Sequence, residues 1–171
     1  MDYLSGIIVH TPLWVWALFI YLLVRGIKAR QPATVKLEKL EKLLIVPAIF
    51  LVWDLYDLIA FRPPTVGTWA MWVLGLLAGA AIGYMLINPQ HIQPGNESRS
   101  LQRPGDYTVL PMMMIAFLTK YAFGVLTAIS PTTMTQPGLS GLAIVSGGVF
   151  AGTFMGKFIH YVRCYAAFKQ N

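Results

Sequence analysis

Residues 43–61 read LLIVPAIFLVWDLYDLIAF, an apolar run of 19 residues that contains two carboxylates, Asp54 and Asp57. A bilayer core about 30 Å thick needs roughly 20 predominantly apolar residues per helix. The stretch is therefore predicted to cross a membrane as a helix, with a kink at Pro47 and an end at Arg62-Pro63-Pro64.

The composition extends this reading to the whole chain of 171 residues, of which 56% are hydrophobic and only 12% are charged. These values lie outside the usual range of soluble domains. We predict an all-α fold, a polytopic transmembrane helical bundle of five spans in a single domain, residues 1–171. The predicted spans are residues 7–27, 43–61, 69–87, 107–129 and 139–162.

The local structure of three segments at the ends of the spans and between them can be predicted from their residues. Thr11-Pro12 favours a helix N-cap followed by proline at the first helical position. Residues 30–44, RQPATVKLEKLEKLL, have an amphipathic, near-helical pattern that predicts a lead-in to the second span at the membrane interface. We favour a solvated charged turn continuous with that span over a partner-binding helix. Residues 88–106 are polar and rich in proline and glycine, which predicts an aqueous loop, with a small hairpin turning at Pro94-Gly95-Asn96 as a variant.

The distribution of lysine and arginine predicts the orientation. Eleven of these residues fall in the first loop, the third loop and the C-terminal segment, whereas Arg62 alone falls on the opposite side. Because cytoplasmic loops carry an excess of basic residues, the N-terminus is predicted outside and the C-terminus in the cytoplasm.

The third and fifth predicted spans carry glycines four residues apart, a spacing that lets two membrane helices approach closely. We predict that these glycines are helix-packing positions and that they offer faces for a homo-oligomer. They are Gly75, Gly79 and Gly83 in one span and Gly148, Gly152 and Gly156 in the other.

The ionisable residues inside the spans are candidate site residues, because a charge near the bilayer centre costs several kcal/mol and needs a partner. At 1.5 Å per helical residue, Asp54 and Lys120 each lie about 3 Å outward of mid-span, and Asp57 and His10 lie about 8 and 10 Å outward. We predict a polar seam in the outer half of the bundle. Its members are His10, Asp54, Asp57 and Lys120, with Tyr56 and Tyr121 as hydrogen-bond donors.

Three interpretations of this seam remain open. It is a buried ion pair that sets helix register, a water-filled pocket or path for protons or solutes, or a contact that acts only in an oligomer. Lys157 and His160 lie toward the cytoplasmic end, where long side chains reach the interface.

Motifs for catalysis are not recognised: the chain has no HExxH, GxSxG or P-loop pattern, and its three histidines fall at different levels. We therefore predict no catalytic residue, no metal and no cofactor. Cys164 is the only cysteine, which excludes an intrachain disulfide. The basic residues lie beside apolar spans, so membrane lipids rather than nucleic acid are the expected partners.

Three segments carry a resemblance to a known family: HTPLWVWALF at residues 10–19, LLIVPAIFLVW at 43–53 and RPGDYTVLPMMMIAFLTKYAFGV at 103–125. Through them the chain resembles a family of uncharacterised small bacterial inner-membrane proteins, over nearly its whole length. The most specific parts are the HTPLWV start, the RPG turn and the KYxxGV run. The resemblance implies a bacterial inner-membrane location and no mechanism, and Asp54 and Asp57 are not part of the family pattern.

Together these observations favour a structural or assembly accessory bundle with a buried Asp/Lys seam. The alternative is a small permease or ligand-binding membrane protein that uses a polar pocket in the outer half of the bundle.

Overall fold

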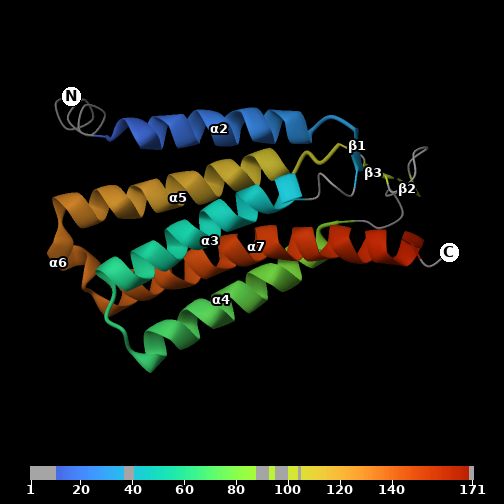
Figure 1. Ribbon diagram of the computed structural model, residues 1–171. Coiled ribbons are helices and arrows are strands. Elements are labelled where there is room, and N and C mark those ends of the chain that lie inside the picture. The colour runs from blue at the N-terminus through green and yellow to red at the C-terminus, as the bar shows by residue number, and fades with distance from the viewer. Residues whose placement is uncertain (1–10, 37–40, 88–92, 95–99, 104, 170–171) are drawn as a thin grey trace. The chain divides into compact units, whose positions relative to one another are not determined.

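The structure is a computed structural model that describes residues 11–36, 41–87, 93–94, 100–103 and 105–169. Helices dominate these residues, as predicted, and three short strands lie between them in the sequence, of which β1 was not predicted (Figure 1). The chain forms two compact units. We call Met1–Gln31 with Gly105–Met134 the hairpin unit, and Pro32–Pro104 with Thr135–Asn171 the core unit.

The hairpin unit consists of α2 (Leu13–Ala29), α5 (Val109–Ile129) and the short α6 (Pro131–Met134). Helices α2 and α5 are antiparallel neighbours. Gly26, near the end of α2, lies against Leu110 at the start of α5, where an added β-carbon would be 3.0 Å from the Leu110 Cα. Further along, the rings of Phe19 and Phe117 lie 5.3 Å apart between centroids.

The start of α2 differs from the prediction by one residue. Pro12 is the N-cap rather than the first helical residue, its carbonyl accepts a hydrogen bond from the backbone N–H of Val15 at 3.0 Å, and no side chain caps the helix. Thr11 instead places its hydroxyl 2.6 Å from that of Tyr121 on α5. The threonine therefore joins two helices instead of capping one.

The core unit consists of α3 (Glu41–Phe61), α4 (Val66–Met85), α7 (Pro137–Lys169) and the three strands. Helix α7 packs against both α3 and α4 (Figure 1). Phe50 of α3 stacks on Phe154 of α7 with ring centroids 4.9 Å apart. Near the other end of the contact, Arg62, just after α3, reaches Ser140 of α7, so α3 and α7 run in opposite directions.

Helices α4 and α7 run parallel and contact each other through glycine. An added β-carbon at Gly75 would lie 2.6 Å from the carbonyl oxygen of Val145, and one at Gly83 would lie 2.9 Å from the Cα of Thr153. All six glycines singled out in the sequence are buried in this contact. An oligomer that used the same glycine faces would have to replace a contact within the chain.

Helix ends follow from local chemistry. Pro63 and Pro64 cannot continue α3, and α4 then starts at the N-cap Thr65, whose side chain accepts a hydrogen bond from the backbone N–H of Thr68 at 3.2 Å. Pro47 lies inside α3, which continues through it.

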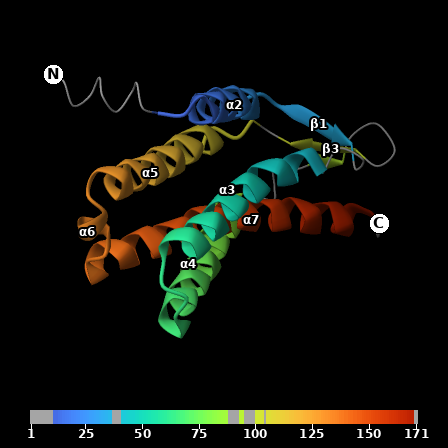
Figure 2. The same cartoon turned by 60° about the vertical axis from the view of Figure 1, so that its left-hand side comes forward.

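The strands β1 (Ala33–Lys36), β2 (Gln93–Pro94) and β3 (Ser100–Arg103) form an antiparallel sheet in the order β1-β3-β2. Figure 2 shows β1 beside β3. The near-helical lead-in predicted for residues 30–44 is therefore wrong over Ala33–Lys36, since strand pairing with a distant segment overrides the local helical pattern. The pairing of β2 with β3 agrees with the hairpin variant of the third loop, whose turn lies outside the described residues.

Four of the described helices contain segments long and apolar enough to cross a membrane: Leu44–Phe61, Val66–Met85, Val109–Ile129 and Pro137–Cys164. They correspond to the second to fifth predicted spans. The first predicted span, residues 7–27, coincides with α2 from Leu13 onward, and α2 has 17 residues.

Candidate functional site

Asp54 lies where three helices of the core unit meet. Its side chain on α3 is only 3% exposed, and the indole N–H of Trp72 on α4 donates a hydrogen bond to its Oδ2. Gly147 on α7 closes the third side, because a β-carbon there would lie 2.7 Å from the Asp54 carboxyl carbon. Trp72 thus supplies a hydrogen-bond donor to the carboxylate, and Gly147 is small enough to leave it room.

Asp54 and Trp72 meet because of their matching positions along adjacent helices. Asp54 is seven residues before the end of α3 at Phe61, and Trp72 is six residues after the start of α4 at Val66. At 1.5 Å per residue both lie about 10 Å from the same connection. The sequence alone gives these equal distances. They predict the contact only if the indole N–H of Trp72 is counted as a hydrogen-bond donor.

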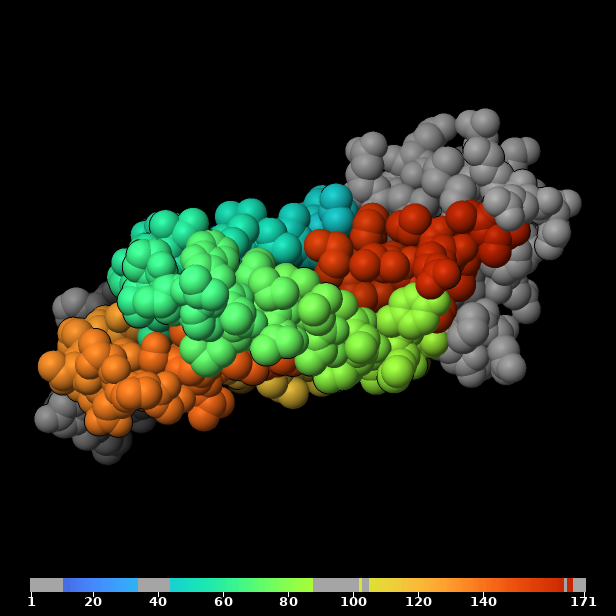
Figure 3. Space-filling view, turned by 90° about the horizontal axis from the view of Figure 1, so that it is seen from below, coloured from blue at the N-terminus to red at the C-terminus, as the bar shows by residue number. Residues whose placement is uncertain are grey.

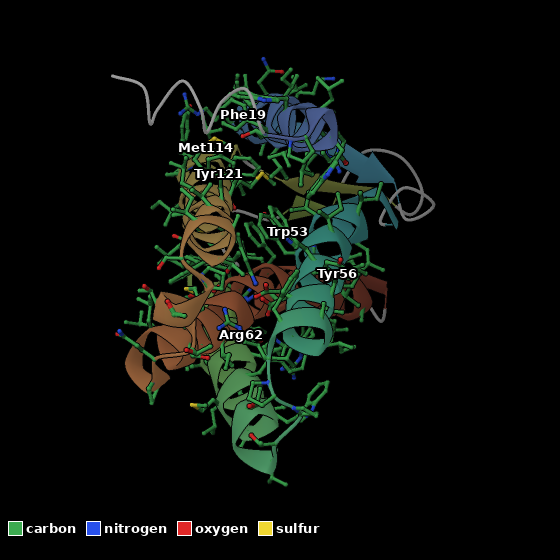
Figure 4. All side chains as sticks on the ribbon, turned by 90° about the vertical axis from the view of Figure 1, so that its left-hand side faces the viewer. Phe19, Trp53, Tyr56, Arg62, Met114 and Tyr121 are labelled. Atoms are coloured by element: carbon green, nitrogen blue, oxygen red, sulfur yellow. The ribbon has the colours of Figure 1, made fainter. Side chains whose placement is uncertain are left out.

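The other predicted residues on α3 lie differently. Asp57 is partly exposed, and Tyr56 is 63% exposed with its ring edge-on to Phe61 at 6.1 Å (Figure 4). Since successive helical residues are about 100° apart, Tyr56 points away from the side of α3 that carries Asp54. The structure therefore does not bring the Tyr56 hydroxyl to the carboxylate of Asp54.

The remaining predicted residues belong to the hairpin unit. Lys120 is buried on α5, with 7% of its surface exposed. Tyr121 forms the hydroxyl contact with Thr11, and its ring stacks on Phe117 at 6.1 Å between centroids. His10 lies outside the described residues. The proposed pairing of Lys120 with Asp54 joins residues of different units and stays a prediction.

A second polar cluster lies where α4 ends beside α7. The Nδ1 atom of His160 is 2.9 Å from the backbone carbonyl oxygen of Tyr84, and the two rings are 4.5 Å apart. Because a carbonyl only accepts, Nδ1 carries the proton in this contact. Arg163 donates from Nη1 to the Tyr84 hydroxyl at 3.4 Å, with its guanidinium carbon 5.9 Å from the ring centroid. The sequence had indicated an interfacial position for His160 but not its contact with Tyr84.

Near the opposite end of α7, Arg62 is also buried, with 8% exposed. It donates from Nη1 to the hydroxyl of Ser140 at 3.1 Å (Figure 4). The contact connects the end of α3 to the first turns of α7. Among the described residues, no group of three or more His, Cys, Asp or Glu side chains is arranged to hold a metal ion.

The helices and their buried polar contacts define a class: mainly helical proteins whose helices are long and apolar enough to span a membrane. Within that class the chain belongs to the family of unknown function DUF6622, whose model matches residues 2–167. This confirms the resemblance to an uncharacterised family. No match was found among curated proteins or among solved structures.

Proposed function

We propose that the protein crosses a bacterial inner membrane five times, with its N-terminus outside and its C-terminus in the cytoplasm. The parallel packing of α4 and α7 supports an odd number of crossings between them, and α5 supplies one. Helix α2, antiparallel to α5, is proposed as the first span.

Contacts between connecting segments support the same topology. In the hairpin unit the backbone N–H of Asp106 donates to the carbonyl of Ala29 at 2.8 Å. In the core unit β1 pairs with β3. The first and third loops, which both contain basic residues, are therefore held together, as expected for loops on one side of a membrane. The excess of basic residues makes that side cytoplasmic.

We further propose that the protein acts through helix contacts, as a structural or assembly accessory in the membrane. The observation that carries this proposal is the enclosure of Asp54, a residue that is 3% exposed and whose carboxylate lies against Trp72 and Gly147. A buried carboxylate that is hydrogen-bonded and closely packed specifies how helices meet, since any other arrangement strands a charge in an apolar environment.

An accessory protein is expected to be extracted together with partner proteins. The test is to extract the tagged protein from its native membrane into polymer-bounded lipid discs and to measure the mass and composition of the particles. Particles that contain a defined second protein in constant ratio support the proposal. Particles that contain this chain alone, together with solute uptake by reconstituted vesicles, contradict it.

The alternative, a small permease or ligand-binding protein, draws its support from the ionisable groups buried at membrane depth, Asp54 and Lys120. Access of water to Asp54 separates the two functions. Asp54→Cys in a Cys164→Ser background should resist a charged, water-soluble thiol reagent if the carboxylate lies in a closed helix junction. Rapid labelling, compared with an exposed control such as Gln136→Cys, would favour the hydrated pocket.

A further inference from the structure

The cluster of Tyr84, His160 and Arg163 has the donors and the position of a binding site for an anionic group. Tyr84 is one residue before the end of the apolar segment Val66–Met85, and Arg163 is one residue before the end of Pro137–Cys164. Because α4 and α7 are parallel and in contact, these two side chains lie at the same end of the helix pair. In a membrane this is the level of the lipid headgroups.

Within the part of the chain that the structure describes, this cluster keeps hydrogen-bond donors for a ligand. The Tyr84 hydroxyl accepts from Arg163, so its own O–H hydrogen is left to donate. The Arg163 side chain is exposed, and its contact with Tyr84 employs one of the five N–H donors of a guanidinium. An arginine and a hydroxyl side by side match two oxygens of a phosphate, which arginine recognises well through its planar fork.

His160 of α7 holds Tyr84 in place. This imidazole is 6% exposed, packs against the Tyr84 ring and hydrogen-bonds the Tyr84 backbone carbonyl. A side chain that is already held loses less conformational freedom on binding, so the two donors are preorganised.

The electrostatics of the two helices favour an anion. Neither α4 nor α7 contains Asp or Glu, while α7 carries Lys157, Arg163 and Lys169 in its last 13 residues. Helix α7 extends past the end of α4, and its red C-terminal half reaches the surface beside that end (Figures 1 and 3). No carboxylate of these helices competes for the arginine.

We propose that Tyr84 and Arg163 bind the phosphodiester group of an anionic membrane phospholipid, with His160 as the positioning residue. The site takes the headgroup phosphate, while Leu77, an exposed apolar residue two turns before Tyr84 on the same face of α4, lies along the acyl chains. This inference rests on the proposal that α4 and α7 cross the membrane, and it holds for either orientation of the chain.

The test measures lipid binding to the full-length, delipidated protein in a neutral detergent, by native mass spectrometry and by the shift of the thermal unfolding midpoint. Phosphatidylglycerol is compared with phosphatidylcholine of the same acyl chains and with inorganic phosphate. Phosphatidylglycerol should bind and stabilise. Arg163→Gln should weaken its binding about 10-fold, the usual effect of losing a charge-assisted hydrogen bond, and Tyr84→Phe by a smaller factor.

The matched control is Arg30→Gln, which removes an exposed arginine at the end of α2 and should leave phosphatidylglycerol binding unchanged. If the two arginine variants lost phosphatidylglycerol binding equally, general surface charge would explain the binding, and the proposed site would be wrong. Equal stabilisation by inorganic phosphate would overturn the assignment to a lipid. Membrane insertion is measured separately by extraction of membranes at high pH, so failure of lipid binding in an inserted protein refutes this inference alone.

Discussion

The indole N–H of Trp72 donates a hydrogen bond to the carboxylate of Asp54, and this contact connects α4 to α3 in the interior of the core unit. Both helices lead to the same short connection, so the two residues meet at one level. We propose that this contact sets the register of the two helices, because a buried carboxylate needs its partner in place.

Trp72→Phe should lower the stability of the protein by about 1 to 3 kcal/mol, because a buried charged acceptor loses a donor. The measurement is the unfolding midpoint in detergent. Trp69→Phe, one turn away with 38% of the side chain exposed, is the control and should have little effect. Equal effects of the two substitutions would mean that ring size rather than the hydrogen bond matters.

Gly147→Ala should destabilise the protein by about 1 to 3 kcal/mol, as overpacking does, because its methyl group would collide with the Asp54 carboxylate. Gly138→Ala is the matched control in the same helix, since a β-carbon there meets nothing within 4 Å. Combining Gly147→Ala with Asp54→Ala should cost less than the two single losses together. Strict additivity would show that the two residues do not touch.

Gly79→Leu and Gly152→Leu should each lower the unfolding midpoint in detergent or alter the oligomer size. A β-carbon at either site would lie 2.8 Å from a backbone carbon of the facing helix, in Val149 or Leu76. Close backbone approach provides much of the attraction between membrane helices. If both variants keep the stability and size of the wild type, the parallel α4–α7 contact is wrong.

Asp54 and Lys120 should be energetically coupled, a prediction that comes from their matching depth in the sequence. Asp54→Asn and Lys120→Met should each destabilise, by up to about 3 to 5 kcal/mol where a buried pair is broken. The double variant should recover much of that loss in a thermodynamic cycle. Independent, additive losses would assign Lys120 to another partner.

Topology is tested with reporters that are active only outside the cytoplasm. A fusion after Asn171 should be silent, and an insertion at Thr133 in α6 should be active, because eleven of the thirteen basic residues are predicted on the cytoplasmic side. The reverse pattern would invert the proposed orientation but would leave the helix contacts intact.

Hydropathy and helix breakers determined most of the secondary structure of this chain. The predicted span 43–61 corresponds to α3, and Val109–Ile129 begins two residues after its predicted start, because apolar length and proline positions act locally. The same information placed Asp54 and Lys120 in the interior of their spans, and the structure buries both.

Contacts between distant segments were decided only by the tertiary structure. The pairing of Ala33–Lys36 with Ser100–Arg103 replaced a locally helical pattern, since a strand gains its hydrogen bonds from a partner that the local sequence does not contain. Likewise, glycine spacing predicted close packing but not that α4 would meet α7 in parallel.

The candidate site, too, was predicted in part by the sequence and decided in part by the tertiary structure. The sequence by itself predicted that a carboxylate lies within an apolar helix long enough to span a membrane, because Asp54 stands inside a long apolar run. Only the tertiary structure decided that Trp72 is its donor and that Tyr56 faces away from it. The reason is physical: depth along one helix depends on residue number alone, whereas hydrogen-bond partners depend on how helices rotate and pack against one another.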